Sequence, residues 1–498
     1  MRTLQSTQAQ PRPLGELLAG MNPVASPYAA LPISHLTLDS RQAGSGSLFF
    51  GLPGEKSDGR EFVSKAFASG ASAAIVESQG WHVENSDRPC FAIANLRAKV
   101  GVIADRFFGH PSRTLCVIGV TGTNGKTSCA TLLAQALELL GHKSGFIGTP
   151  GWGFLDDLEP STLTTPDAVT LQSHLAALVE RGADSVCLEV SSHALDQGRI
   201  EGVQFDSAVF TNLSRDHLDY HKSMDAYAQT KLLLFQRQEL KSAVINISDP
   251  VGAQFSGEKL NARLWTFGRA APADVFPLWH RVSEKGLSMS LRSPIGEIEF
   301  ESRLHGDFNV ENLMAVVTTL VAQQYSSSDI SRVMARLDPV IGRMNLCKGS
   351  GGLRPTVVID YAHSPGALKA SLESARSLTR GALWCVFGCG GERDRGKRPT
   401  MGQLASALAD HVVLTNDNPR GEVPSQILSA IETGLERPAD AVIPDRAQAI
   451  AYAIENASPH DLILIAGKGH ERFQLIGNQA IPFSDREVAE QLLGMMPC

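Results

Sequence analysis

The segment VIGVTGTNGKTS, residues 117–128, joins an apolar run to a glycine-rich turn that ends in a lysine and two hydroxyl side chains. The N–H groups of such a turn, with the N-terminus of the helix that follows, form a cradle for phosphate. In this pattern Lys126 reaches the β- and γ-phosphates and the Thr127 hydroxyl ligates Mg²⁺. Because Val120 stands where the usual template has glycine, the spacing predicts a shortened phosphate loop, and the alternative is a tight strand-to-helix turn. The residues expected to hold nucleotide are Gly122, Thr123, Asn124, Gly125, Lys126, Thr127 and Ser128.

Two further residues could complete a metal site, and a nearby lysine has no such role by pattern. Glu189 closes the apolar run CLEV, and a carboxylate there is costly unless it is paired or bound to a metal. With Thr127 and a nucleotide phosphate it would make an oxygen-rich Mg²⁺ site. His217, in SRDHLDYH, is a less usual Mg²⁺ ligand, and its alternative role is a hydrogen-bonding loop histidine. By pattern alone, Lys231 in YAQTKLLLF is an ordinary helix lysine.

The elements that must position these residues alternate short apolar runs with amphipathic stretches. This pattern predicts an α/β fold with mainly parallel sheets. A helix is expected from Lys126 to about Leu140, where Gly141 ends it. In open α/β sheets, ligands bind beyond the carboxyl ends of the strands. Polar, glycine-rich segments follow seven predicted strands; they begin TGTNGKTS, SSH, RDHLDYH, YAHSPG, CGGERDRGKR, NPRG and KGHE.

The chain of 498 residues is long enough for about three domains. Breaks are expected near FFGHPSRT at 107–114 and in the glycine-rich stretch CKGSGGLRPT at 347–356. The predicted domains are therefore residues 1–112, 113–345 and 346–498.

Charge and cysteine usage exclude several classes of protein. A net charge of -7 argues against a nucleic-acid binder, which would need a basic face. The eight cysteines form no CxxC pair and several lie in apolar runs, which predicts reduced thiols and a cytoplasmic location. Cys385 and Cys389 have no histidine cluster beside them, so a metal site there is not favoured. Neither a secretory signal nor a membrane span is expected.

Eight motifs occur in order along the chain: TGTNGKTS, EVSSHALDQGR, TNLSRDHLDYH, GRMN, DYAHSPGAL, GCGGERDRGKRPTMG, DNPRGEVP and AGKGHERFQ. Together they resemble the Mur ligases of peptidoglycan synthesis, in particular the members that add meso-diaminopimelate. The resemblance runs from about residue 36 to the C-terminus. It implies a UDP-sugar-binding N-terminal domain, a central P-loop ATPase domain and a C-terminal Rossmann-like domain that binds the amino acid.

The resemblance also implies a reaction. ATP phosphorylates the D-glutamate carboxylate of UDP-N-acetylmuramoyl-L-alanyl-D-glutamate, and the amine of meso-diaminopimelate attacks the resulting acyl phosphate to form an amide. A carboxylate is a poor acyl donor, whereas phosphate leaves well. In the family, the lysine that matches Lys231 is carbamylated by CO₂ and holds a second Mg²⁺, and His217 is a metal ligand beside Glu189. Asn309, Arg343, Asp360 and His363 match positions near the nucleotide, and Asp360 is expected to be structural.

Substrate contacts follow from the same motifs. The residues that match UDP-sugar-peptide contacts are Leu38, Ser40, Glu55, Lys56, Ser57, Thr164, Thr165, Ser191, Gln197 and Arg199. Leu163 stands where the family often has asparagine. Those that match the amino-acid pocket are Arg393, Asp417, Asn418, Pro419, Arg420, Gly467 and Glu471. The planar fork of Arg420 suits the distal carboxylate of diaminopimelate, which lysine lacks.

Other ligases and a different class of protein remain as alternatives. A lysine-adding ligase or a folylpolyglutamate synthase would share the phosphate loop, but the DNPR and TLDSR segments argue against both. A P-loop switch or motor would need no amino-acid pocket. The expected partners are small-molecule substrates, without nucleic acid or membrane insertion, and the expected state is a monomer.

Overall fold

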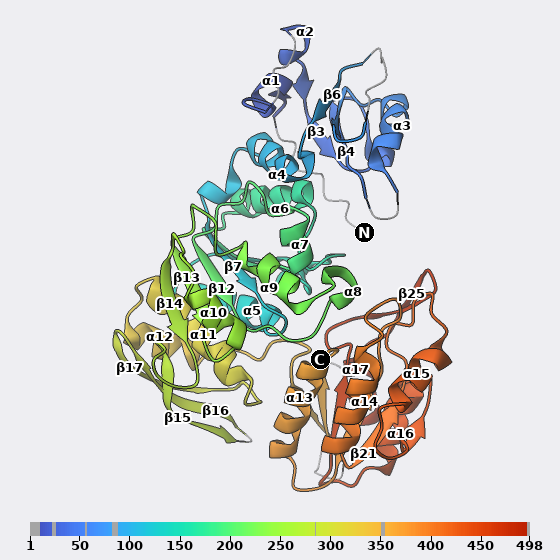
Figure 1. The fold of residues 1–498 in the computed structure, drawn as a ribbon. Coiled ribbons are helices and arrows are strands. Elements are labelled where there is room, and N and C mark those ends of the chain that lie inside the picture. Colours follow the sequence, from blue (N-terminus) through green and yellow to red (C-terminus); the bar gives the residue numbers. More distant parts are fainter. Residues whose placement is uncertain are drawn as a thin grey trace. The chain divides into compact units, whose positions relative to one another are not determined.

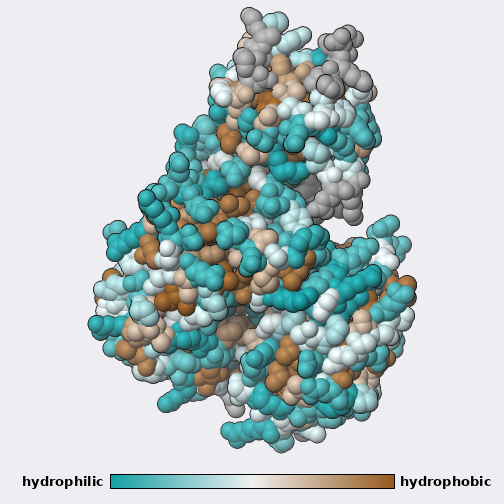
Figure 2. Space-filling view, in the orientation of Figure 1, coloured by the Kyte–Doolittle hydropathy of each residue, from teal (hydrophilic) through white to brown (hydrophobic). Residues whose placement is uncertain are grey.

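The computed structural model describes residues 10–21, 26–54, 57–81, 88–283, 285–349 and 354–495 (Figure 1). The chain forms two compact units, each described here by itself. The first comprises Met1–Gly119, Gly141–Ala208 and Leu233–Lys241, and the second comprises Val120–Leu140, Val209–Leu232 and Ser242–Cys498. Among the described residues, every helix is too short or too polar to cross a membrane. Hydrophilic residues cover most of the face that Figure 2 shows, with apolar patches between them.

The N-terminal part of the first unit is a small parallel sheet. Its strands run in the order β3 (His35–Thr37), β4 (Ser47–Gly51), β5 (Ala73–Glu77) and β6 (Cys90–Ile93). Side chains alternate along a strand, so Leu48 and Phe50 face one core while Phe49 faces another. Helices α1 (Leu14–Leu17) and α4 (Leu96–Phe107) cover the first of these faces and α3 (Val63–Ala68) covers the second. Short elements precede the sheet: β1 (Arg12–Pro13), α2 (Ser26–Ala29) and β2 (Pro32–Ile33).

The rest of the first unit carries a second group of strands. Their order is β10 (Asp157–Glu159), β9 (Gly151–Phe154), β8 (Ser144–Gly148) and β11 (Ser185–Glu189), with β8 and β11 parallel. Helix α6 (Ala168–Glu180) begins where the Asp167 carboxylate accepts hydrogen bonds from Val169 N–H and Thr170 N–H, both at 3.0 Å. The short helix α7 (Ser192–Asp196) follows β11 directly.

The second unit contains the phosphate loop. Strand β7 (Cys116–Thr121) leads into the loop, and α5 (Lys126–Leu139) leaves it; Gly141 follows with φ +98°, as expected for a helix stop. Helix α11 (Asn309–Ala322) packs against α5 and against the parallel pair β13 (Ser242–Asn246) and β14 (Arg263–Phe267). The remaining elements of this part are β12 (Ser207–Phe210), α8 (Leu218–His221), α9 (Met224–Leu232), α10 (Pro250–Ser256), α12 (Ser327–Met334) and the antiparallel strands β15 (Phe276–Ser283), β16 (Gly286–Ser293) and β17 (Gly296–Ser302).

The C-terminal part of the second unit is a six-stranded sheet between two layers of helices (Figure 1). Its order is β18 (Asn345–Lys348), β19 (Thr356–Asp360), β23 (Leu462–Ala466), β20 (Leu383–Phe387), β21 (His411–Leu414) and β22 (Ala441–Val442). All but β18 are parallel. One face packs on α13 (Pro365–Leu378), α14 (Lys397–Leu408) and α15 (Pro424–Glu432), and the other on α16 (Arg446–Asn456) and α17 (Asp485–Leu492). The hairpin of β24 (Phe473–Ile476) and β25 (Gln479–Pro482) lies outside this sheet.

These elements confirm the predicted α/β class and its parallel strands. The predicted helix from Lys126 to about Leu140 is also confirmed. All cysteines within the described ranges are free thiols, as expected. Burial raises the pKa of the Cys389 thiol to about 12, so this residue behaves as a small apolar side chain.

Candidate active site

The phosphate loop is held in shape by the segment that follows β12. Thr123 N–H donates to Asn212 O at 2.8 Å, and Asn124 N–H donates to Asn212 Oδ1 at 3.0 Å. Two of the N–H groups that we expected the loop to present are therefore used within the protein. The close approach depends on Gly122, where a Cβ would lie 1.9 Å from Thr211 Oγ1. The N-terminus of α5, which follows the loop directly, adds partial positive charge that favours an anion there.

Two lysines meet at this loop. Lys126 Nζ donates to Gly122 O and Thr123 O, both at 2.8 Å, and Lys231 Nζ donates to the same Gly122 O at 2.9 Å. The Lys231 side chain is buried, with its ammonium 4.7 Å from the centre of the Tyr227 ring. Burial and the neighbouring Lys126 lower the pKa of Lys231 well below its usual value. Lys231, an ordinary helix lysine by pattern, is thus a buried amine that can lose its proton.

Asp216 lies at the centre of a second group of residues in this part of the chain. Its carboxylate lies 3.7 Å from His217 Nε2 and 4.0 Å from His363 Nε2. Lys397, which is buried, donates to His363 O at 2.8 Å. Burial alone would raise the pKa of Asp216, but His217, His363 and Lys397 lower it to about 2. The motifs singled out His217 and His363, whereas the roles of Asp216 and Lys397 became visible only from the fold.

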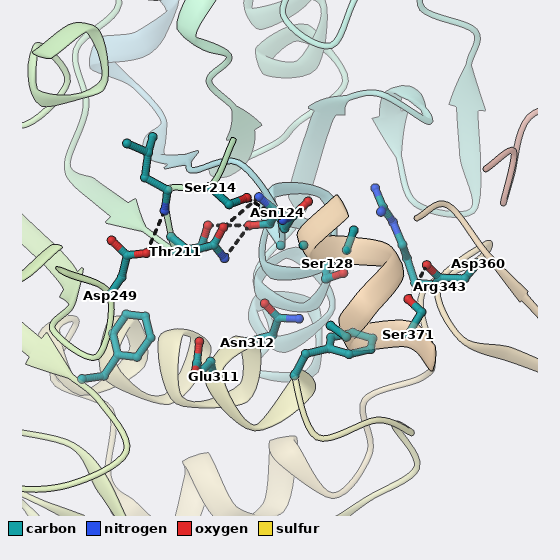
Figure 3. A pocket seen from close by; sticks show the side chains of 18 residues that line it. Asn124, Ser128, Thr211, Ser214, Asp249, Glu311, Asn312, Arg343, Asp360 and Ser371 are labelled. Atoms are coloured by element: carbon teal, nitrogen blue, oxygen red, sulfur yellow. Dashed lines mark hydrogen bonds between the residues drawn. The ribbon is translucent and has the colours of Figure 1, made fainter. Parts of the chain in front are cut away.

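A cavity of about 290 Å³ opens beside the phosphate loop (Figure 3). Three loop residues named from the sequence line it, Asn124, Gly125 and Ser128, as does Arg343. Its walls combine apolar and polar groups: Leu213, Phe267, Phe308, Ala367 and Ala370 on the apolar side, and Thr211, Asn212, Ser214, Asp249, Glu311, Asn312, Asp360 and Ser371 on the polar side. An apolar wall with a few convergent polar groups beside a phosphate cradle suits the base and ribose of a nucleotide.

Asn309 and Asp360, both expected near the nucleotide, have supporting positions. Asn309 Oδ1 accepts a hydrogen bond from Asn312 Nδ2 at 2.8 Å, so Asn309 orients the asparagine that lines the cavity. Asp360 is buried and accepts from Met344 N–H and Ala362 N–H, both at 2.8 Å. This agrees with the structural role expected for it. Arg343 Nη2 donates to Thr127 Oγ1 at 3.2 Å, which ties the GRMN segment to the phosphate loop.

In the first unit, two motifs that are distant in sequence form one hydrogen-bonded group. Thr165 Oγ1 donates to Glu189 O at 2.7 Å and accepts from Ser191 N–H at 3.0 Å. Arg199 donates to Thr165 O at 3.0 Å and to Gln197 Oε1. The structure thus brings together four of the predicted sugar-peptide contacts, namely Thr165, Ser191, Gln197 and Arg199.

Glu189 belongs to the same group. Its side chain is buried and accepts from Thr149 N–H at 2.8 Å, while Thr164 Oγ1 lies 3.0 Å from Thr149 Oγ1. Leu163, which stands beside Thr164 where the family often has asparagine, is 43% exposed. The carboxylate is therefore fixed at the carboxyl end of β11, where an oxygen ligand for a metal was expected.

The N-terminal predictions are only partly covered by the described residues. Leu38 is half-buried against the N-terminal core, and Ser40 is buried at the start of a short turn capped by Asp39. Ser57 is exposed, and Glu55 and Lys56 lie outside the described residues.

The predicted amino-acid pocket lies at the carboxyl ends of β20, β21 and β23. The segment after β21 carries Asp417, Asn418, Pro419 and Arg420; that after β20 carries Arg393; and that after β23 carries Gly467 and Glu471. Arg420 Nη1 donates to Gly391 O at 2.9 Å, and burial together with Arg393 lowers the pKa of Arg420. Gly467 is required here because a Cβ would lie 2.4 Å from Asp417 Oδ2. Two guanidinium groups and two carboxylates therefore share one sheet edge.

Asn418 is hydrogen-bonded to other residues around the predicted amino-acid pocket. Its Oδ1 accepts from Leu475 N–H at 3.0 Å and from Lys468 Nζ at 3.0 Å, and its Nδ2 donates to Glu471 Oε2 at 2.9 Å. The amide oxygen already has two donors, so in this state Asn418 acts mainly as a support for Glu471. Lys468 was not predicted, although it lies inside the GKGHE motif.

The described residues contain no cluster of three or more His, Cys, Asp or Glu side chains that could hold a metal ion.

Comparison with known proteins gives a consistent result. Three domain models match: "Mur ligase family, catalytic domain" over residues 32–107, "Mur ligase middle domain" over 120–320 and "Mur ligase, glutamate ligase domain" over 342–469. The chain is 46% identical to the UDP-N-acetylmuramoyl-L-alanyl-D-glutamate–2,6-diaminopimelate ligase of Pseudomonas aeruginosa, over 93% of this chain and 95% of that protein. It is 42% identical to the ligase of the same name from Vibrio cholerae, over 97% and 99% of the two chains.

Solved structures agree in fold. A ligase of the same name superposes with a TM-score of 0.70 at 34% identity, covering 97% of this chain and 99% of that one. The folylpolyglutamate synthase of Mycobacterium tuberculosis gives 0.63 at 19% identity, over 81% and 96%, which shows a shared fold alone. On the three domain models and these long, highly identical alignments, the chain belongs to the Mur ligase family.

Proposed function

We propose that this Mur ligase joins meso-diaminopimelate to the D-glutamate of UDP-N-acetylmuramoyl-L-alanyl-D-glutamate, with cleavage of ATP to ADP and phosphate. The observation that carries the proposal is the pair of guanidinium groups, Arg393 and Arg420, set beside Asp417 and Glu471 at one sheet edge. This combination suits an amino acid whose far end has both a carboxylate and an ammonium group. The names of relatives at 42–46% identity support the same substrate.

The first chemical step is phosphoryl transfer to a carboxylate. The D-glutamate γ-carboxylate attacks the γ-phosphorus of ATP, the bond to the bridging oxygen breaks, and ADP leaves. Lys126, which already lies over the loop, would stabilise the charge on the transferred phosphoryl group. By the family resemblance, Thr127, Glu189 and His217 would be the Mg²⁺ ligands, and their oxygen and imidazole donors suit that ion. Bound Mg²⁺ would supply charge neutralisation at the phosphate oxygens.

The second step is amide formation. The uncharged amine of diaminopimelate attacks the acyl carbon, and the tetrahedral intermediate collapses to an amide, phosphate and a proton. Arg393 and Arg420 would hold the far carboxylate so that the reacting amine is positioned and not merely bound. Groups at the phosphate loop and at the edge of the C-terminal sheet would thus act on one substrate pair.

Lys231 fits the carbamate that the family resemblance implies. Only an uncharged lysine amine can attack CO₂, and burial and the neighbouring Lys126, which lower the pKa of Lys231 well below its usual value, favour that form. The nitrogen lone pair of the uncharged amine forms the new bond to carbon, and loss of one proton from that nitrogen leaves a carbamate anion. That anion would offset Lys126 and provide a further oxygen ligand for Mg²⁺. We further propose that the enzyme acts as a monomer in the cytoplasm.

The test is a reconstitution with purified protein, ATP, Mg²⁺ and the UDP-dipeptide, with meso-diaminopimelate or L-lysine as the acceptor. Phosphate release should require both the UDP-dipeptide and meso-diaminopimelate, and mass spectrometry should detect the tripeptide product. Phosphate release without either substrate would indicate a nucleotide switch. A preference for L-lysine would assign the protein to a different branch of the family.

A further inference from the structure

Lys468 is a fully buried lysine to which the sequence motifs assign no role. Its side chain is 0% exposed, and Nζ donates to Glu471 Oε2 at 2.7 Å and to Asn418 Oδ1 at 3.0 Å. Both acceptors belong to the predicted amino-acid pocket. A buried ammonium is costly unless it is paired and hydrogen-bonded, and here it has both kinds of partner.

The backbone around Lys468 is built to turn this side chain inward. Gly467 has φ +118° and Gly469 has φ +53°, which few other residues adopt. A Cβ on Gly469 would lie 2.6 Å from Gly342 O. The Lys468 carbonyl then accepts from Glu471 N–H at 2.9 Å, so the lysine and its carboxylate partner share one turn. The two glycines fix the direction in which Lys468 points.

The hydrogen bonds leave one face of Glu471 open. Its Oε2 accepts from both Lys468 Nζ and Asn418 Nδ2, at 2.7 and 2.9 Å. Its Oε1 has no donor among the residues that the structure describes, and the side chain is 30% exposed. One oxygen is therefore fixed by the protein, and the other is available to an incoming donor.

We propose that Lys468 is a positioning residue for amino-acid selection: it holds Glu471 Oε2 and Asn418 Oδ1 so that Glu471 Oε1 faces the distal ammonium group of the substrate. This inference rests on the proposed function. It separates two tasks within the pocket. Arg420, with Arg393, recognises the distal carboxylate, whereas Lys468 acts through Glu471 on the distal ammonium.

Two substrate analogues separate these tasks. 2-Aminopimelate keeps the reacting amine and the distal carboxylate of diaminopimelate but lacks the distal ammonium. L-Lysine keeps the two amines but lacks the distal carboxylate. An intact pocket should discriminate against both analogues. Loss of Glu471 positioning should remove only the discrimination against 2-aminopimelate.

The experiment measures KM and kcat of Lys468→Met for ATP, meso-diaminopimelate and both analogues. The KM for diaminopimelate should rise about 10- to 100-fold, because an ordered charge-assisted hydrogen bond is lost, while the KM for ATP stays unchanged. Preference for diaminopimelate over 2-aminopimelate should fall by the same factor, and preference over L-lysine should persist. Lys369→Met, at a 56% exposed lysine on α13, is the matched control and should behave as the wild type.

A double-mutant cycle that combines Lys468→Met with Glu471→Gln tests whether Lys468 acts through Glu471. If Lys468 acts through Glu471, the double variant should be no worse than Glu471→Gln alone. Additive effects, or an equal loss of preference over both analogues, would overturn the proposal. If Lys468→Met does not bind ATP, Lys468→Gln, whose amide can still donate one hydrogen bond, is measured in its place against the same criteria. If the wild type uses diaminopimelate and Lys468→Met has the same KM and the same substrate preferences, this inference is refuted while the proposed function stands.

Discussion

Two buried lysines in the second unit, Lys231 and Lys468, show how the surroundings of one residue type decide its chemistry. Lys231 lies beside a second cation, Lys126, and its nearest acceptor is a backbone carbonyl. In the described ranges of the chain it has no carboxylate within salt-bridge distance. Lys468 instead has a carboxylate at 2.7 Å and an amide oxygen at 3.0 Å.

The difference follows from elementary electrostatics. Burial disfavours an ammonium ion, and a neighbouring cation disfavours it further, so Lys231 can exist as a nucleophilic amine. An anionic partner offsets the cost of burial, so Lys468 can serve as a fixed charge that orients Glu471. The phosphate side of the site thus holds a lysine suited to covalent modification, and the amino-acid side holds one suited to positioning.

The largest expected effect is that of Lys231→Ala, which should lower kcat about 100- to 1,000-fold because a charge-stabilising group is lost at the phosphoryl site. If the carbamate is the active form, formate, acetate or propionate should restore part of the activity by supplying a carboxylate in the vacated space. Steady-state assays with and without these salts make the measurement, and Lys241→Ala, at a 76% exposed lysine, is the control. If Lys231→Ala is active and the added carboxylates do not raise its activity, the carbamate is not needed and the proposed difference in chemistry between Lys231 and Lys468 is refuted.

A smaller effect, confined to the amino-acid side, is expected for Arg420→Ala. The KM for diaminopimelate should rise about 10- to 100-fold, because hydrogen bonds between charged groups are lost, while the KM for ATP is unchanged. Arg420→Lys keeps the charge but loses the planar fork, so it should recover only part of the loss. Both variants keep a Cβ at the φ of +52°, so they do not alter the backbone strain at this position. A selective loss of ATP affinity would show that Arg420 is wrongly assigned.

On the phosphate side, Gly125→Ala should raise the KM for ATP about tenfold. Its φ is +85°, and the new Cβ would lie 2.6 Å from Asn312 Oδ1, so the loop or the asparagine must shift; such strain typically costs about 1–3 kcal/mol. Gly141→Ala is a matched control, since its φ is +98° and no atom lies within 4 Å of the added Cβ. That control should lower the denaturation midpoint and leave the KM for ATP unchanged. Equal ATP binding in both variants would contradict the assigned role of the loop.

The sequence was informative about chemistry and backbone geometry that depend on residues close together in the chain. The turn at residues 121–125 requires glycine at positive φ, and the helix after it begins at Lys126 and ends before Gly141, all readable from residue type. The rule that parallel strands present ligand groups at their carboxyl ends also placed Arg420 and Glu471 at one edge before any coordinates. These features depend on neighbours a few residues away.

The sequence could not provide what depends on distant partners. The motifs gave Lys468 no role, and its buried ammonium donates to Asn418 Oδ1, 50 residues earlier in the chain. Phe267 and Phe308 line the cavity. In the sequence, a phenylalanine among apolar residues gives no indication that it lines a ligand-binding cavity. The motif places Asn418 in the amino-acid pocket, but it does not show that the amide oxygen accepts hydrogen bonds from Leu475 N–H and Lys468 Nζ. In each case the tertiary arrangement decides which side chain meets which.

The smallest predicted effect concerns stability and pH. The pKa of Lys231 is lowered on folding from about 10.5, so between the two values the unfolded chain binds one more proton at this residue than the folded chain. Stability therefore rises with pH across this window, by at most about 1.4 kcal/mol per pH unit for one group. Relative to Lys231→Met, which lacks this titration, the wild type should gain stability as the pH rises toward 10.5 in CO₂-free buffer. Denaturation midpoints of the two proteins at each pH give the comparison. A constant difference would mean that Lys231 keeps its proton, and the distinction from Lys468 would then lie in partners and not in protonation.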